Sequence, residues 1–259
     1  MKRILLVIVL VLVAGVVGVM RHGAKFERNQ ESRNDIRQQY ELSAGARVEV
    51  SGINGFVRIE TSDQTTASVE ISVIGHSPED VNDAATIEQT SEGLSVRGRR
   101  NGSSLFQRLW HGAVRQEVLL KTPRDIALIV RGVNGSVTSG AVNGTAQVSG
   151  VSGAVELDGT RGYTEVAGIN GGVSLSVDRL DDKGIRVSGV NGGVVLRLSP
   201  NTNADVNAHG IMGKVRSEGL NFDTDDDQPR SRFSGRIGTG GAPINISGVN
   251  GGVKFIGTR

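Results

Sequence analysis

The stretch GVNGSVTSGAVNGTAQVSGVSGAVELDGTRGYTEVAGINGGV, residues 132–173, decides the fold because it repeats on a nine-residue period. A glycine recurs at every ninth position, at Gly135, Gly144, Gly153, Gly162 and Gly171. Between these glycines the apolar residues are two apart, as in Val155 and Leu157, and this spacing predicts strands, since side chains alternate between the faces of an extended chain. Each unit is therefore expected to be a short strand followed by a tight bend.

A short unit that cannot bury its own apolar face indicates a stacked array. Two nine-residue units make a coil of 18 residues, which places Asn134, Ser152 and Asn170 in one column. Later coils lengthen to 21 residues, and the 38-residue interval from Met212 to Asn250 is expected to hold one coil plus a loop at residues 218–241. The glycines after Asn, Gly171 and Gly192 among them, are expected at positive φ. The sequence thus predicts an all-β parallel β-helix, or solenoid, over residues 44–259.

An antiparallel meander or sandwich is the alternative fold. Asn-Gly between apolar strands is also a strong hairpin motif. Hairpins, however, give no reason for like residues to recur in an 18- or 21-residue column. A lone unit of the same type, Gly52-Ile53-Asn54-Gly55, lies eighty residues ahead of the main array.

Composition narrows the function classes. The 259 residues include 37 Gly and only six Phe, two Tyr and one Trp, so the core must be aliphatic. The formal net charge is +2, which leaves no large field of one sign to hold nucleic acid. Cysteine is absent, which excludes disulfides and thiolate metal sites.

The first twenty residues contain an unbroken apolar run from Ile4 to Met20 behind Lys2 and Arg3. A helix of this length reaches roughly 25 Å, close to the bilayer core of about 30 Å. We expect residues 1–20 to be an uncleaved signal anchor that contacts the membrane through residues 4–20, or alternatively a cleaved signal peptide that yields a secreted product. A polar stalk over residues 21–43 follows. The β domain is expected outside the cytoplasm, in the periplasm or on the cell surface.

One segment, residues 99–113, breaks the repeat. Leu105, Phe106, Leu109 and Trp110 have the spacing of a short amphipathic helix, and Trp110 is the single Trp. Two interpretations stay open: a flap that covers an open end or side of the stack, or an element that contacts a partner or the membrane, because apolar loops with Trp and Arg resemble interface anchors.

The Val-x-Gly-Val-Asn-Gly-Gly-Val units (residues 187–194, and with Ile first at 246–253), the apolar N-terminus and the lone Gly-Ile-Asn-Gly unit resemble a bacterial family of adhesin-like proteins of unknown function, the "putative adhesins". The family is similar in style to auto-transporter adhesin heads that carry a Gly-Ile-Asn motif. The resemblance covers about residues 40–259 and implies a right-handed β-helix in the cell envelope. It supplies no catalytic residues.

A search for enzyme chemistry finds one carboxylate pair, Glu156 and Asp158, which lie two apart on one predicted strand. Their expected neighbours one coil away, Thr138 and Ser174, do not support catalysis. The remaining candidates fail on spacing: the acidic run Asp223–Asp227, the glycine run Gly238–Gly241, and the histidines His22, His76, His111 and His209.

The expected function is therefore an adhesin-like binding or structural role without catalysis or cofactors. Its partner would be a glycan or a protein surface. A carbohydrate-active lyase or hydrolase and a self-assembling scaffold remain as alternatives.

Overall fold

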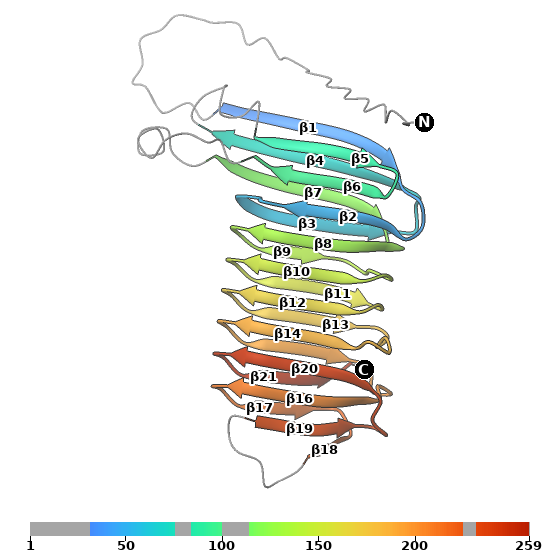
Figure 1. The fold of residues 1–259 in the computed structure, drawn as a ribbon, viewed down its shortest axis with the longest axis vertical. Helices are drawn as coiled ribbons and strands as arrows, with labels where there is room; N and C mark the ends of the chain where they lie inside the picture. Colours follow the sequence, from blue (N-terminus) through green and yellow to red (C-terminus); the bar gives the residue numbers. More distant parts are fainter. Residues whose placement is uncertain (1–31, 76–83, 100–113, 225–231, 259) are drawn as a thin grey trace, which may run out of the picture. The chain divides into compact units, whose positions relative to one another are not determined.

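The computed structural model describes residues 32–75, 84–99, 114–224 and 232–258, and this part of the chain folds into 21 β-strands without a helix. The strands form two sheets (Figure 1). Sheet A has ten strands, in spatial order β1 (Ser32–Glu41), β4 (Thr66–Gly75), β7 (Arg115–Pro123), β3 (Gly55–Ser62), β9 (Val137–Ser139), β11 (Val155–Thr160), β13 (Val173–Val177), β15 (Val194–Leu198), β21 (Val253–Gly257) and β17 (Val215–Glu218).

Sheet B has eleven strands and lies face to face with sheet A. Its spatial order is β18 (Phe222–Thr224), β19 (Arg232–Ile237), β16 (Ala204–Ile211), β20 (Ala242–Val249), β14 (Ile185–Val190), β12 (Thr164–Ile169), β10 (Ala146–Val151), β8 (Ile126–Val133), β2 (Ala46–Ser51), β6 (Gly93–Gly98) and β5 (Ala85–Thr90).

In the middle of the stack the chain alternates between the two sheets. We call two consecutive strands, one in each sheet, a rung; β10 with β11 is an example. Each rung pairs in parallel with the next, and Val137, Val155 and Val173 are register partners 18 residues apart, followed by Val194 after 21. The predicted coil length and the shared column of Asn134, Ser152 and Asn170 are confirmed. The lone Asn54 unit is also a rung, because β2 and β3 pair directly with β8 and β9.

The core lies between the sheets and is aliphatic, as the composition predicts. Along β10, β12, β14 and β20 buried and outward side chains alternate until a glycine adds one residue before the last buried position, and most buried residues in register change little from rung to rung. One such row is Val148, Val166, Val187 and Ile246, each at most 1% exposed. Burial of a Val or Ile side chain is worth roughly 1.5–3 kcal/mol. Stacking like on like therefore gives every rung the same packing surface.

The fold class needs a correction. The strands form two open, facing sheets and not a closed β-helix, so the sandwich alternative describes the layers better. The antiparallel pairing expected of that alternative is nevertheless confined to the two ends of the stack, in β1–β4, β4–β7, β5–β6, β16–β19 and β18–β19. Each nine-residue unit has one bend and one strand. Two units therefore supply one strand to each of two sheets, and no strand is left for the third face of a β-helix.

The first described strand corrects the predicted stalk. Residues 32–41, expected to lie in a polar linker, form β1 and pair antiparallel with β4 along their whole length. Only Ile36 and Tyr40 on its inner side are apolar, so the apolar alternation that predicts a strand is weak here. The backbone pairing with β4 holds it instead, and polar side chains on its outer side add contacts: Arg37 pairs with Glu70 at 2.6 Å, and Ser72 donates to Asp35 at 2.6 Å. An edge strand tolerates such a composition, and its charges discourage pairing with other chains.

The predicted loop at residues 218–241 is also wrong in its described part, because it contains strands β18 and β19. Both are antiparallel and extend sheet B beyond the end of sheet A. Phe222 lies 5.5 Å from the buried Phe255 and 5.3 Å from Phe233, between ring centroids. Gly235 makes room for this ring, since a Cβ there would lie 2.5 Å from Phe222 Cε1. Three of the six Phe thus close this end of the core.

The glycines at the bends have two different roles, and the prediction for Gly171 and Gly192 is wrong. Positive φ occurs three residues earlier, at Gly168 (65°) and Gly189 (63°). Gly171 is required for another reason, since a Cβ would lie 2.5 Å from the carbonyl oxygen of Gly153 on the rung below. The same contact recurs from Gly192 to Gly171, also at 2.5 Å. These glycines permit the close approach of successive backbones.

We expect Gly171→Ala to destabilise the protein by about 1–3 kcal/mol, the usual cost of forcing atoms into a filled site. Gly172→Ala is the matched control, because its Cβ would meet nothing closer than 3.6 Å and its φ is not positive. Urea unfolding followed by circular dichroism measures both. Equal stability of the two variants would contradict the close-approach role.

Candidate functional site

The residues predicted to contact a partner lie outside the described part of the chain. Leu105, Phe106, Leu109 and Trp110 belong to residues 100–113, and the apolar run 4–20 belongs to residues 1–31. None of the described segments forms a helix long and apolar enough to cross a bilayer. The contact and the membrane segment both stay predictions.

The structure places the carboxylate pair as the sequence predicted. Glu156 and Asp158 are exposed on β11, and the register partners of Glu156 are Thr138 and Ser174. The pairing shifts after Leu157, where Gly159 has a φ of 68° and forms a bulge. Glu156 therefore has a hydroxyl side chain in register on either side, and neither strand pairs it with a further acid or base.

The described residues contain no group of three or more His, Asp or Glu side chains that could hold a metal ion. His209 is exposed on β16, and the other three histidines lie outside the described ranges. Asp223, the first residue of the acidic run, lies on β18, and Asp225–Asp227 lie outside the described residues. The glycine run at 238–241 is followed by strand β20, whereas a phosphate loop leads into a helix.

Charged side chains line two hollows on the described surface. The first, about 480 Å³, is lined by Asn143, Arg161, Asp178 and Arg179 at the bends that lead into sheet B. Its ion pair joins Arg161 and Asp178 at 3.3 Å. The two partners are 17 residues apart because the register shifts between Leu157 and Thr160, so the 18-residue period alone would have set Arg161 beside Arg179.

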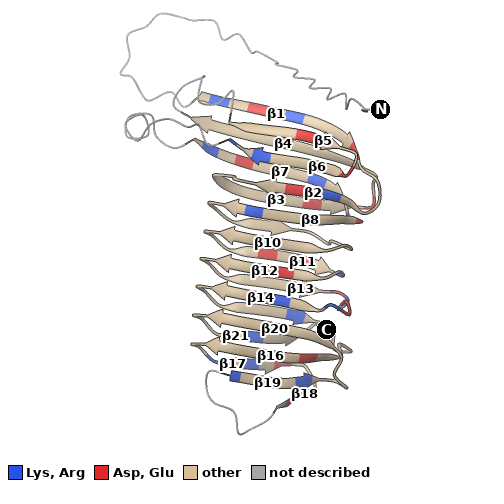
Figure 2. Cartoon of the chain, in the orientation of Figure 1, with Lys and Arg blue, Asp and Glu red and all other residues tan. Residues whose placement is uncertain are grey.

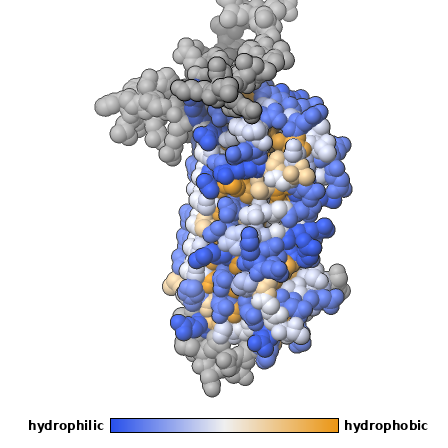
Figure 3. Space-filling model, turned by 45° about the vertical axis from the view of Figure 1, so that its right-hand side comes forward, coloured by the Kyte–Doolittle hydropathy of each residue, from blue (hydrophilic) through white to orange (hydrophobic). Residues whose placement is uncertain are grey.

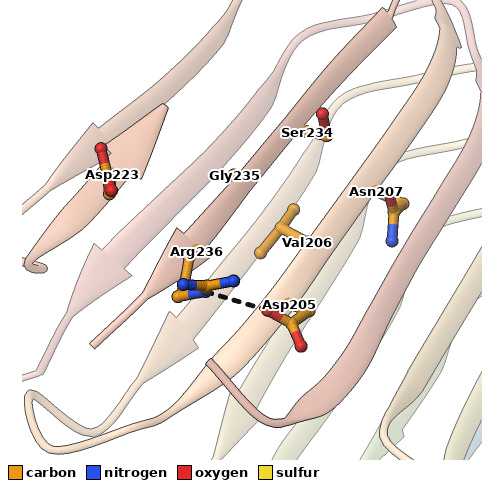
Figure 4. A pocket seen from close by; sticks show the side chains of 7 residues that line it. All are labelled: Asp205, Val206, Asn207, Asp223, Ser234, Gly235 and Arg236. Atoms are coloured by element: carbon orange, nitrogen blue, oxygen red, sulfur yellow. Dashed lines mark hydrogen bonds and ion pairs between the residues drawn. The ribbon is translucent and has the colours of Figure 1, made fainter. Parts of the chain in front are cut away.

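The second hollow, about 360 Å³, lies on the outer strands of sheet B (Figure 4). Arg236 of β19 points toward Asp205 of β16, and the two side chains are 3.4 Å apart. Asp205 also accepts from the Gly241 N–H at 3.2 Å. Its carboxylate therefore fixes the connection into β20. No local motif predicts the Arg236–Asp205 pair from the sequence, because the two residues are 31 positions apart.

The titratable groups with shifted pKa values lie away from both hollows. The Ser72 hydroxyl donates to Asp35 and lowers the pKa of this carboxyl below its ordinary 3.8, and Arg33 lowers it further. Burial raises the pKa of Tyr40 and of Tyr163. Perturbed groups gathered in a cleft would indicate an active site. Asp35 and Tyr40 lie on β1 and Tyr163 lies at the bend before β12, so none of them lines either hollow.

The outer faces carry polar side chains in register, with both charge signs along the stack (Figure 2). One row on sheet B is Gln147, Glu165, Arg186 and Asn245, and the neighbouring row is the small Ser149, Ala167, Ser188 and Ser247. The face in Figure 3 is mostly polar with small apolar patches. Met212, at 80% exposed, is the one large hydrophobic side chain exposed among the described residues.

At the bends into sheet A, asparagine side chains form a ladder along the stack. Asn191 donates from Nδ2 to Oδ1 of Asn170 at 2.7 Å and accepts from Nδ2 of Asn250 at 2.6 Å. Asn134 donates to Asn54 in the same way at 2.7 Å. Ser152 interrupts the ladder between these two runs. The amides bond to one another, so the ladder stabilises the bends and offers few free groups to a ligand.

Comparisons with known proteins give only distant likenesses. No family model and no curated protein matches this chain. A solved structure of a "putative cell adhesion protein" from Clostridium sporogenes is 12% identical with a TM-score of 0.45, covering 88% of this chain and 100% of that one. A "putative adhesin" from Parabacteroides distasonis is 11% identical with a TM-score of 0.34, covering 86% and 97%.

A "putative lipid binding protein", also from Parabacteroides distasonis, is 12% identical with a TM-score of 0.28, covering 87% of this chain and 97% of that one. The first two names agree with the family that the repeat resembles, and the third does not. At these TM-scores, however, the similarities carry no argument about function.

The ladder predicts opposite effects for two substitutions. Asn191→Ala removes two hydrogen bonds and should lower the free energy of unfolding by about 1–2 kcal/mol. Ser152→Asn should raise it by about 0.5–1.5 kcal/mol, because the new amide would join Asn134 to Asn170. Ser152→Ala is the control and should be neutral. Urea unfolding measures all three, and a destabilised Ser152→Asn variant would contradict the ladder.

Proposed function

We propose that this protein is a non-catalytic, adhesin-like binding or structural protein of the bacterial cell envelope. Its described part is a stack of rungs that displays polar side chains at regular intervals. The ligand proposed for it is a glycan or a protein surface. The carbohydrate-active alternative is not proposed, because Glu156 and Asp158 lack supporting groups in register.

The observation that carries this proposal is the pair of rows on the outer face of sheet B. Register pairing sets Gln147, Glu165 and Arg186 side by side on adjacent strands. Strands in a sheet are about 4.8 Å apart, so these side chains recur at that interval along the stack. Such a surface is extended and open. It suits an elongated ligand better than a small substrate, which needs a deep pocket.

The membrane tether belongs to the same proposal. Residues 4–20 are long and apolar enough to span a bilayer, with Lys2 and Arg3 before them. We place the β stack outside the cytoplasm, in the periplasm or on the cell surface, with the secreted form as the alternative. The absence of cysteine is compatible with either side of the membrane.

Protease added to intact spheroplasts of a bacterial host that expresses the full chain should digest the β stack. The reason is that the tether leaves residues from about 40 onward on the outer side. A cytoplasmic marker protein must stay intact in the same sample. Full protection of the stack until the spheroplasts are lysed would overturn the proposed location.

The contact residues proposed for the ligand are Leu105, Phe106, Leu109 and Trp110. Large aromatic side chains contribute most of the binding energy at interfaces. The described surface exposes just one large hydrophobic side chain, Met212. The sequence supplies apolar anchors of the required kind in residues 105–110, within a segment that departs from the repeat.

Replacing Phe106 and Trp110 together with Ala should weaken capture of a glycan or protein ligand at least tenfold. Loss of about 1.4 kcal/mol of contact energy suffices for this change. Met212→Ala is the control, because it removes an exposed apolar side chain outside this segment, and it should bind like the parent. Binding to a glycan array and pulldown from envelope extracts measure the effect. If the double variant instead loses most of its thermal stability, the segment is a structural flap.

A further inference from the structure

The rung β20–β21 occupies a position that does not follow chain order. β16 and β17 come before it in the sequence but lie beyond it in the stack. β20 pairs in parallel with β14 on one side and β16 on the other, and β21 pairs in the same way with β15 and β17. The rung therefore fills a slot between two rungs, β14–β15 and β16–β17, that both precede it in the sequence (Figure 1).

The slot is highly complementary to this rung. The inner side chains of the rung, Ile244, Ile246, Val249, Val253 and Phe255, are all at most 1% exposed. Phe255 also completes the aromatic cluster with Phe222. Both edges of the slot present backbone hydrogen-bonding groups that need a parallel strand. If the rung were absent, four strands would lose a partner.

A short connection holds the rung in place. Residues 238–241 alone join β19 to β20, although these strands lie on opposite sides of β16. Three of the four residues are glycines with φ of 60°, 81° and 151°. The Thr239 N–H is bonded to Asn203 and the Gly241 N–H to Asp205. Short, tight hinge loops favour exchange of the segment that they connect.

We propose that the slot between β14–β15 and β16–β17 also accepts the β20–β21 rung of a second copy of this chain. The contacts in the slot are the same whether the rung comes from its own chain or from the copy. The exchange therefore costs association entropy and releases the tight turn at residues 238–241. It gives a self-association that depends on concentration. This inference is independent of the proposed ligand binding.

The chain has no cysteine, so an introduced pair can report where the rung lies. Ser188 and Ser247 are register partners on β14 and β20, at half-buried outer positions. In the variant S188C/S247C the disulfide joins one chain to itself when the rung is in its own slot. It joins two chains when the rung has been exchanged.

The full-length variant is unfolded, refolded in detergent at a low and an about hundredfold higher concentration, and oxidised. On non-reducing gels we expect the disulfide-linked dimer to increase at the higher concentration. The control A167C/S188C pairs β12 with β14, which are successive rungs, and should give the intramolecular disulfide at both concentrations. If circular dichroism shows that S188C/S247C does not refold, R186C/N245C tests the same two strands. An intramolecular disulfide alone at every concentration would overturn the proposal.

Discussion

The close approach of successive backbones at the bends is the constraint on which this structure depends. Gly153, Gly171, Gly192 and Gly251 each sit directly against the carbonyl of the glycine one rung away, where a Cβ would be 2.4–2.6 Å from its oxygen. Because the bends stack without side chains between them, the strands that follow enter the sheets in register. The aliphatic rows, the asparagine ladder and the polar rows on the outer faces all follow from that register.

Register has a consequence for function, since it determines which groups are left for a ligand. The asparagine amides bond mainly to one another, and the ion pairs Arg161–Asp178 and Arg236–Asp205 fix bends and connections. Exposed ion pairs of this kind add little stability, about 0–1 kcal/mol each. Within the described part of the chain, what remains for recognition is the arrangement of side chains on the faces, which supports binding by an extended surface over binding in a pocket.

The sequence predicted the repeating middle of the stack well, because its signals are local. Alternation as in Val155 and Leu157 defines a strand, and the distance from Asn134 to Ser152 defines the rung. The ends were predicted poorly. β1 has an inner face that is half polar and is stabilised by β4, and β18 and β19 depend on Phe222 packing over Gly235. Positive φ was assigned to Gly171 in place of Gly168. A recurring glycine in a sequence can reflect either a positive φ or a lack of room for a Cβ, and the sequence does not distinguish the two. Of the candidate site, Glu156 and its neighbours were placed correctly.

The position of β20–β21 also affects how the chain can reach its native state. A stack in which each rung follows the last can grow by adding neighbours one at a time, and its contacts are close in sequence. Here β14 and β15 must wait for partners about 60 residues further along, as Ile185 does for Ile244. These pairings raise the contact order, which slows folding. Until residues 242–257 are available to pair, one edge of β14 and one edge of β15 stay open, and open strand edges favour association with other chains.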